Sequence, residues 1–116
     1  MRITGPEKEA LLELAERAIV EKISSRQLMP PRELDLTEAM KCHCAAFVSV
    51  YIADELRGCI GTFSEEEALY RTVERMAVSA ALFDSRFAPV QFHELSELVL
   101  EISVLSPRQR ISDPSE

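Results

Sequence analysis

Residues 45–63 constrain the fold most, because they contain two strand-like runs joined by a short polar connection. β-forming residues dominate 45–52, and alternation gives that run two faces that both look largely buried. Residues 53–55 are short and polar enough to turn the chain, and 56–63 resumes a strand-like pattern, so the stretch predicts an antiparallel hairpin. The first run carries Ala46, Val48, Val50 and Ile52 on one face and Phe47, Ser49 and Tyr51 on the other.

Two glycines, Gly58 and Gly61, interrupt the second run. Glycine weakens a strand because it has no side chain to pack, so these positions indicate a bulge or a close approach of another group to the backbone. The hexapeptide Leu-Arg-Gly-Cys-Ile-Gly at 56–61 is therefore the strongest candidate site in the chain.

Helical signals flank the hairpin. Thr4 and Glu7 fit a capping box that opens a helix over about 6–24, and a short helix is predicted over 37–41. Pro30 and Pro31 make 25–35 a connection. A second capping box at 64–67 predicts a helix over about 65–82, with Glu67 and Arg71 paired on its exposed side. Its expected buried stripe is Leu69, Val73, Met76, Ala77 and Ala80.

The remaining segments complete the fold class. Residues 84–89 are predicted as a loop, 91–96 as a turn of helix, and 98–104 as a strand with one covered face. Strands followed by a helix and another strand predict an α+β domain with a mainly antiparallel sheet and helices packed on it. We expect one domain over 1–116, since this length supports a single hydrophobic core.

Composition narrows the compartment and the partners. No apolar run approaches the roughly 20 residues of a membrane-spanning helix, and the N-terminus does not resemble a secretory signal, so we expect a cytoplasmic protein. Cys42 and Cys44 are too near each other for an easy bridge, so reduced thiols are expected. A net charge of −7 disfavours nucleic acid. No cofactor is predicted, and the oligomeric state is left open.

Several motifs follow one another in a recognisable order. FVSV at 47–50 and LRGCIGTF at 56–63 precede an acidic-capped helix, then Asp84, Arg86 and Phe87, and LEISVLSP at 100–107. This order resembles the AMMECR domain family, named after the Alport syndrome, midface hypoplasia and elliptocytosis region. LRGCIG is that family's hallmark, and the resemblance covers about 8–111. It implies a two-part α/β domain of unestablished activity. In prokaryotes the family often accompanies Memo-type and radical S-adenosylmethionine proteins, as protein A of the AmmeMemoRadiSam system, which implies a modification pathway.

The resemblance also raises a question of length. Related domains continue beyond the strand that ends near Leu105, with a further strand-containing part. This chain is therefore either a shortened member or the front portion of a longer domain.

The motif allows two chemical interpretations. Alternation would place Arg57 and Cys59 on one face, where the guanidinium could favour a catalytic thiolate, with Arg57, Gly58 and Gly61 holding a substrate. Alternatively, Cys59 is a small buried apolar residue among close-packed glycines. Arg57 itself is either an anion-binding residue or an ion-pair partner of a nearby carboxylate. The candidate partners are Asp54, Glu55 and Glu65.

Other chemistry-bearing residues have structural explanations. Asp84 and Arg86 are expected to pair and fix their loop, with Phe87 as an anchor. The spacing of Cys and His residues does not fit a zinc site, so no metal is predicted. The residues considered are Cys42, His43, Cys44, Cys59 and His93. Two hypotheses result: a pathway component that holds a small anionic substrate near LRGCIG, or a non-enzymatic module that binds a protein partner through that surface.

Overall fold

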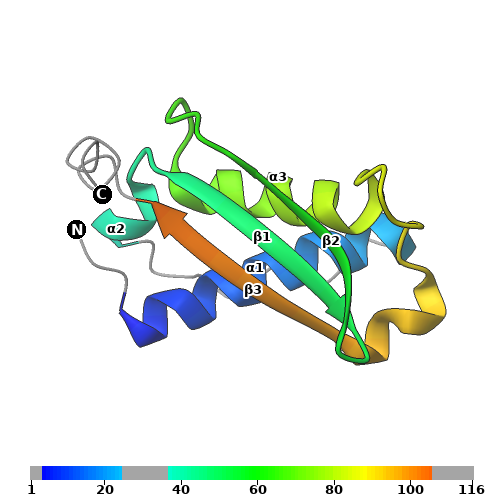
Figure 1. Ribbon diagram of the computed structural model, residues 1–116. Helices are drawn as coiled ribbons and strands as arrows, with labels where there is room; N and C mark the ends of the chain where they lie inside the picture. The colour runs from blue at the N-terminus through cyan, green and yellow to red at the C-terminus, as the bar shows by residue number, and fades with distance from the viewer. Residues whose placement is uncertain (1–3, 25–36, 106–116) are drawn as a thin grey trace.

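A three-stranded antiparallel sheet carries its helices on one face, which confirms the predicted α+β class (Figure 1). The computed structural model describes residues 4–24 and 37–105, so the predicted connection at 25–35 lies outside the described residues. The strands are β1 (Ala45–Ile52), β2 (Glu55–Thr62) and β3 (Leu98–Leu105), in the order β2-β1-β3. The helices are α1 (Gly5–Ser24), α2 (Glu38–Lys41), α3 (Leu69–Leu82) and the 3₁₀ helix η1 (Phe92–Glu97).

β1 is the central strand and has the predicted bounds. Val48 and Val50 are fully buried under the helices, because α3 packs on β1 and β2 while α1 packs on α3 and β3. Phe47, Ser49 and Tyr51 point to the other face and are only half-buried. The expectation that both faces are largely buried is therefore wrong for the outer face, since the described helices cover one side alone.

The predicted hairpin is confirmed, and its turn is built without glycine. Ala53 and Asp54 lie between β1 and β2 with φ values of 50° and 68°, both in the left-handed region. Two consecutive residues with positive φ match the twist of a tight hairpin connection. The Ala53 N–H also donates to the Glu97 carbonyl at 3.4 Å, so the turn is tied to the end of η1.

The predicted helix at 6–24 is confirmed as α1, together with its capping box. The Thr4 N–H donates to Glu7 Oε1 at 2.9 Å, and the Glu7 N–H donates to Thr4 Oγ1 at 3.3 Å. The Thr37 hydroxyl donates to the same Glu7 carboxylate, which ties the start of α2 to the start of α1 and holds the pKa of Glu7 below its ordinary value.

Helix α3 begins at Leu69, four residues later than predicted. The Ser64 hydroxyl accepts from the Glu66 N–H in a local turn, while the Leu69 N–H donates to the Cys42 carbonyl at 2.7 Å. Tertiary hydrogen bonding therefore replaces the expected capping box. The predicted stripe is confirmed as buried: Leu69, Val73, Met76, Ala77 and Ala80.

The thiols of Cys42 and Cys44 form a disulfide, so the expectation of reduced thiols is wrong for this pair. The chain bends between α2 and β1, which brings the two Cα atoms to 5.6 Å, well within the range that a disulfide spans. Cys59 is a free cysteine. Among the described helices, none is long and apolar enough to cross a membrane.

Candidate functional site

The LRGCIG motif lies in β2, which is an edge strand among the described residues and pairs with β1. The register shifts within the motif: Gly58 pairs with Val50, but Leu56 pairs with Tyr51, which leaves Arg57 as an extra residue. Such a bulge redirects the side chain that it contains. The sequence indicated a bulge at these glycines, but the alternation that placed Arg57 beside Cys59 assumed a regular strand, and the bulge breaks that alternation.

The Arg57 guanidinium is directed at η1 and the loop before it. Its Nη1 pairs with Glu94 Oε2 at 2.5 Å, and its Nη2 donates to the carbonyls of Ala88 and Pro89, both at 3.2 Å. Only 18% of the Arg57 side chain is exposed. The ion-pair interpretation thus has a partner in Glu94 rather than in the three carboxylates that the sequence offered.

Glu94 serves two elements at once. Its Oε1 accepts from the Gln91 N–H at 2.8 Å and completes a capping box for η1, while its Oε2 holds Arg57. The hydrogen bond from Arg57, followed by that from Gln91, keeps the pKa of Glu94 below its ordinary value. Sequence reasoning missed this residue, although the spacing of Gln91 and Glu94 matches a capping box.

Both motif glycines are sites of close approach, as predicted. A Cβ on Gly58 would lie 1.7 Å from the Ala80 carbonyl oxygen, because β2 packs directly on the backbone of α3. A Cβ on Gly61 would lie 2.3 Å from the Phe47 ring and 2.6 Å from the Ala46 oxygen. Neither glycine has positive φ, so packing rather than backbone conformation requires them.

The backbone of Cys59 is held by an Asp84–Arg86 pair that follows α3. The Cys59 N–H donates to Asp84 Oδ2 at 3.0 Å, and Arg86 Nη2 donates to the Cys59 carbonyl at 3.1 Å. Arg86 also binds Asp84 through Nε at 3.0 Å and Nη2 at 2.7 Å. The predicted Asp84–Arg86 pair is confirmed, and together the two side chains satisfy the outward N–H and carbonyl of Cys59, at a point of the β2 edge where a neighbouring strand could otherwise bind.

The electrostatics of this pair favour its charged form. The side-chain hydrogen bonds from Arg86, with the Cys59 N–H next, hold the pKa of Asp84 well below its ordinary value. The Asp84 carboxylate in turn raises the pKa of Arg86. Charge-assisted, bidentate contacts of this kind are stronger than neutral hydrogen bonds.

The Cys59 side chain lies on the face of the sheet away from the helices. Ser49 is its cross-strand neighbour, and the Ser49 hydroxyl donates to Cys59 Sγ at 3.2 Å. On the same face, the Tyr51 hydroxyl donates to Glu101 at 3.3 Å, and the Glu101 carboxylate raises the pKa of Tyr51. We call this surface the open face. By register it comprises Phe47, Ser49, Tyr51, Leu56, Cys59, Gly61, Val99, Glu101 and Ser103, and Phe63 extends it through an edge contact with the Phe47 ring.

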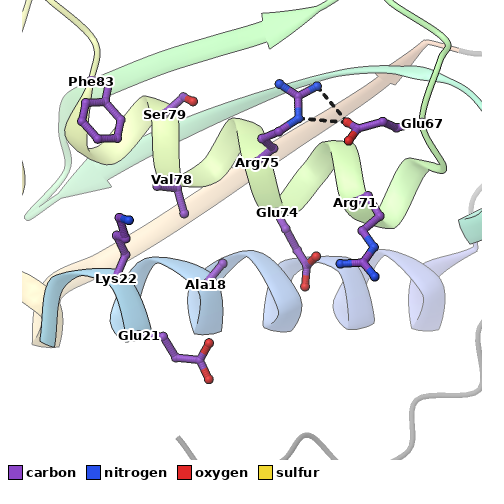
Figure 2. Close-up of a pocket in the computed structure, with 10 residues that line it drawn as sticks. All are labelled: Ala18, Glu21, Lys22, Glu67, Arg71, Glu74, Arg75, Val78, Ser79 and Phe83. Atoms are coloured by element: carbon purple, nitrogen blue, oxygen red, sulfur yellow. Dashed lines mark hydrogen bonds and ion pairs between the residues drawn. The ribbon is translucent and has the colours of Figure 1, made fainter. Parts of the chain in front are cut away.

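A groove of about 720 Å³ lies elsewhere, between α1 and α3 (Figure 2). Arg75 crosses part of it to bind Glu67 Oε1 at 2.8 Å, which replaces the predicted pairing of Glu67 with Arg71. Glu74 is half-buried there, and burial raises its pKa. The lining contains no residue of the motif. This groove mixes both signs of charge, so it presents no single charge to a ligand.

The sulfur and imidazole groups are dispersed. His43 is exposed and its Nδ1 contacts the Glu65 carbonyl at 3.0 Å, while His93 is exposed on η1. Across residues 4–24 and 37–105, no three His, Cys, Asp or Glu side chains come together in a way that could hold a metal ion.

The comparisons place the chain among proteins of one family. The AMMECR1 family model matches residues 12–116. Protein Mbar_A1807 of Methanosarcina barkeri is 33% identical over 98% of this chain, and Protein TK0174 of Thermococcus kodakarensis is 35% identical over 99%. This chain spans 57% and 58% of the lengths of these two relatives.

A solved structure agrees with the sequence relatives. The crystal structure of the uncharacterized protein PH0010 from Pyrococcus horikoshii superposes with a TM-score of 0.79 and 32% identity, over 92% of this chain and 55% of that protein. The resemblance first drawn from the motifs is therefore confirmed: the chain belongs to the AMMECR1 family.

Proposed function

We propose that this chain is a protein-interaction module that binds its partner through the open face, with Cys59 of LRGCIG on the β2 side of that face. The observation that carries the proposal is the distribution of the helices. They cover one side of the sheet, and no described element packs on the other side. That side exposes 59% of Phe63 and 55% of Val99, next to the half-buried Phe47 and Tyr51. Aromatic side chains are enriched at the cores of protein interfaces.

The contacts of Arg57 favour this function over the holding of a small substrate. An anion site needs a cation whose charge is available, but the Arg57 guanidinium is paired with Glu94 and also donates to two carbonyls. The space beside the Gly58 Cα is occupied by the backbone of α3 and does not open toward solvent. The motif therefore supports the shape of β2, and the partly apolar open face is the surface that it leaves accessible. Catalysis by Cys59 stays a prediction, as does the link to a modification pathway.

Capture from lysate of the organism that carries this chain tests the proposal, with side chains chosen for their exposure. Phe63→Ser and Val99→Ser alter the open face, whereas Phe83→Ser alters the groove between α1 and α3. Phe83 is 66% exposed, so it is a matched control for Phe63. A partner retained by the parent and by Phe83→Ser, but lost from both open-face variants, is the expected result.

The resemblance says which partners to seek first, namely Memo-type and radical S-adenosylmethionine proteins. Equal retention of every captured protein by all three variants would contradict the proposal. Saturable binding of a small anion that is lost in Arg57→Ala would favour the substrate-holding alternative instead.

A further inference from the structure

The disulfide between Cys42 and Cys44 belongs neither to the LRGCIG motif nor to the open face. It joins two residues separated by His43, at the junction of α2 and β1 beside the start of α3 (Figure 1). A bridge between residues this close removes little freedom from the unfolded chain, so it adds little to the stability of the fold. Support of the fold is therefore a weak explanation of the pair, and its sulfur chemistry is the stronger one.

The two bridged cysteines differ in their access to solvent. Cys44 is 1% exposed and belongs to the hydrophobic core, whereas Cys42 is half-buried at the margin of that core. His43, the residue between them, is exposed, so the bridge lies close beneath the surface. Reactive cysteines occupy partly exposed surroundings, while fully buried ones are inert. This difference makes Cys42 the residue that an incoming thiol meets first.

The chain around the bridge is held by contacts that do not involve sulfur. The Leu69 N–H donates to the Cys42 carbonyl at 2.7 Å, and His43 Nδ1 contacts the Glu65 carbonyl at 3.0 Å. β1 begins at the residue after Cys44 and fixes that side of the pair in the sheet. These contacts do not depend on the S–S bond, so the two thiols of a reduced chain stay close enough to form it again. The bridge can therefore open and close while the protein stays folded.

We propose that Cys42 and Cys44 form a thiol–disulfide exchange site. Cys42 reacts with the substrate, and Cys44 resolves the mixed disulfide that forms. The substrate is a cysteine thiol, or the corresponding disulfide, carried by a short or extended peptide. A half-buried sulfur at the margin of the core admits a slender chain more readily than the surface of a folded protein.

The exchange takes place in two steps. A substrate thiolate attacks Cys42 Sγ, so that a new S–S bond joins the substrate to Cys42, the Cys42–Cys44 bond breaks, and its electron pair leaves on Cys44 Sγ. A second substrate thiolate then attacks the substrate sulfur of this mixed disulfide and releases Cys42 as a thiolate. Two substrate thiols are thereby oxidised to one disulfide, and the pair is reduced to two thiols that take up the two protons the substrates gave up.

The same steps in reverse reduce a substrate disulfide. The Cys42 thiolate attacks one sulfur of the substrate and releases the other as a thiolate. The Cys44 thiolate then attacks Cys42 Sγ, which restores the bridge and releases the second half of the substrate. The ratio of thiol to disulfide in the surroundings sets the direction.

Opening of the bridge by reduced glutathione in the full chain provides the first test, and it needs no variant. Samples are quenched with acid at intervals and alkylated, and their free thiols are counted by mass spectrometry. The opening rate should rise in proportion to the glutathione concentration and change less than about twofold in urea below the unfolding transition, because the folded chain reacts. Oxidised glutathione should then close the bridge again. An opening rate that climbs steeply with urea and no longer responds to glutathione would overturn the inference, since only the unfolded chain would then react.

Two variants identify the sulfur that reacts. Both carry Cys59→Ser, which removes the remaining thiol; one adds Cys44→Ser and keeps Cys42, and the other adds Cys42→Ser and keeps Cys44. In native protein, iodoacetamide should alkylate Cys42 at least about tenfold faster than Cys44, which is 1% exposed. In urea that unfolds both chains the two rates should be similar, which controls for intrinsic reactivity. Equal rates in native protein, or a faster reaction at Cys44, would contradict the assignment.

The resolving role of Cys44 has a separate readout. Oxidised glutathione is added to the reduced chain that carries Cys59→Ser alone and to the chain that also carries Cys44→Ser. The mixed disulfide on Cys42 should persist in the second chain but reach less than about a tenth of that level in the first, where Cys44 displaces the glutathione. Equal accumulation in the two chains would remove the resolving role and with it the exchange site. These measurements concern the pair alone, so their outcome is independent of partner binding by the open face.

Discussion

Substitution of Gly58 by alanine should destabilise this protein far more than the addition of one methyl group usually does. The new Cβ would lie 1.7 Å from the Ala80 oxygen and 2.6 Å from the Ala80 carbonyl carbon. Both atoms belong to the backbone of α3, so no side chain can rotate away. The strand and helix would have to separate by about 1.3 Å to restore a 3.0 Å contact, and that movement would open the core around Ala80.

We expect a loss of about 3 kcal/mol, the upper end of the usual cost of overpacking, because the obstacle is backbone. For a domain of this size, that loss corresponds to a fall in Tm of roughly 12 °C. Thermal and urea unfolding of Gly58→Ala measure it, with Gly5→Ala as the control because nothing lies within 4 Å of a Cβ there. A Tm within about 2 °C of the parent would show that β2 does not pack on α3 in this way.

Three further predictions concern the core, the loop after α3 and the disulfide. Met76→Asp should cost about 3 kcal/mol or more in urea unfolding, because it buries an unpaired charge, while Met76→Leu should cost less than about 1.5 kcal/mol; equal midpoints for the two would contradict the register of α3. Asp84→Asn should be less stable than the parent at pH 7. The difference in stability should shrink as the pH falls from about 4 to 2, because a carboxyl group with a lowered pKa stabilises the fold only while it is ionised. A difference that stays constant over this pH range would rule out the charged pair. Cys42→Ser with Cys44→Ser should lower the free energy of unfolding by only about 1.5 kcal/mol, since the bridge closes a very short loop, and a reductant should then shift the parent's Tm but not that of the variant.

Local patterns predicted most of the fold. The alternation in 45–52 gave β1 its bounds, and the spacing of Leu69, Val73 and Met76 gave α3 its buried face. These signals are strong because burial on one side of an element imposes a period on its sequence. The start of α3 could not be predicted in the same way, because the Leu69 N–H donates its hydrogen bond to the distant Cys42 carbonyl.

The site was predictable in its location but not in its contacts. Glycine spacing identified LRGCIG, since only a close approach or a bulge explains two glycines within one strand. The direction in which the Arg57 side chain points depends on one extra residue in the pairing of β2 with β1. The alternation of apolar and polar residues in the sequence does not reveal that extra residue. The close spacing of Cys42 and Cys44 argued against a bridge between them. The bridge forms because the backbone bends there, and the spacing does not reveal that bend.

The Asp84–Arg86 pair has a consequence for how LRGCIG can vary. The Arg57 side chain is bound by Glu94, and the packing at Gly58 leaves no room for a side chain. The fold therefore constrains which amino acid can stand at each of these two positions. Cys59 is recognised by Asp84 and Arg86 through its N–H and carbonyl alone, which every residue except proline offers. The Asp84–Arg86 pair therefore needs a residue with an N–H at position 59 but makes no demand on the thiol, which accepts instead from the Ser49 hydroxyl on the open face.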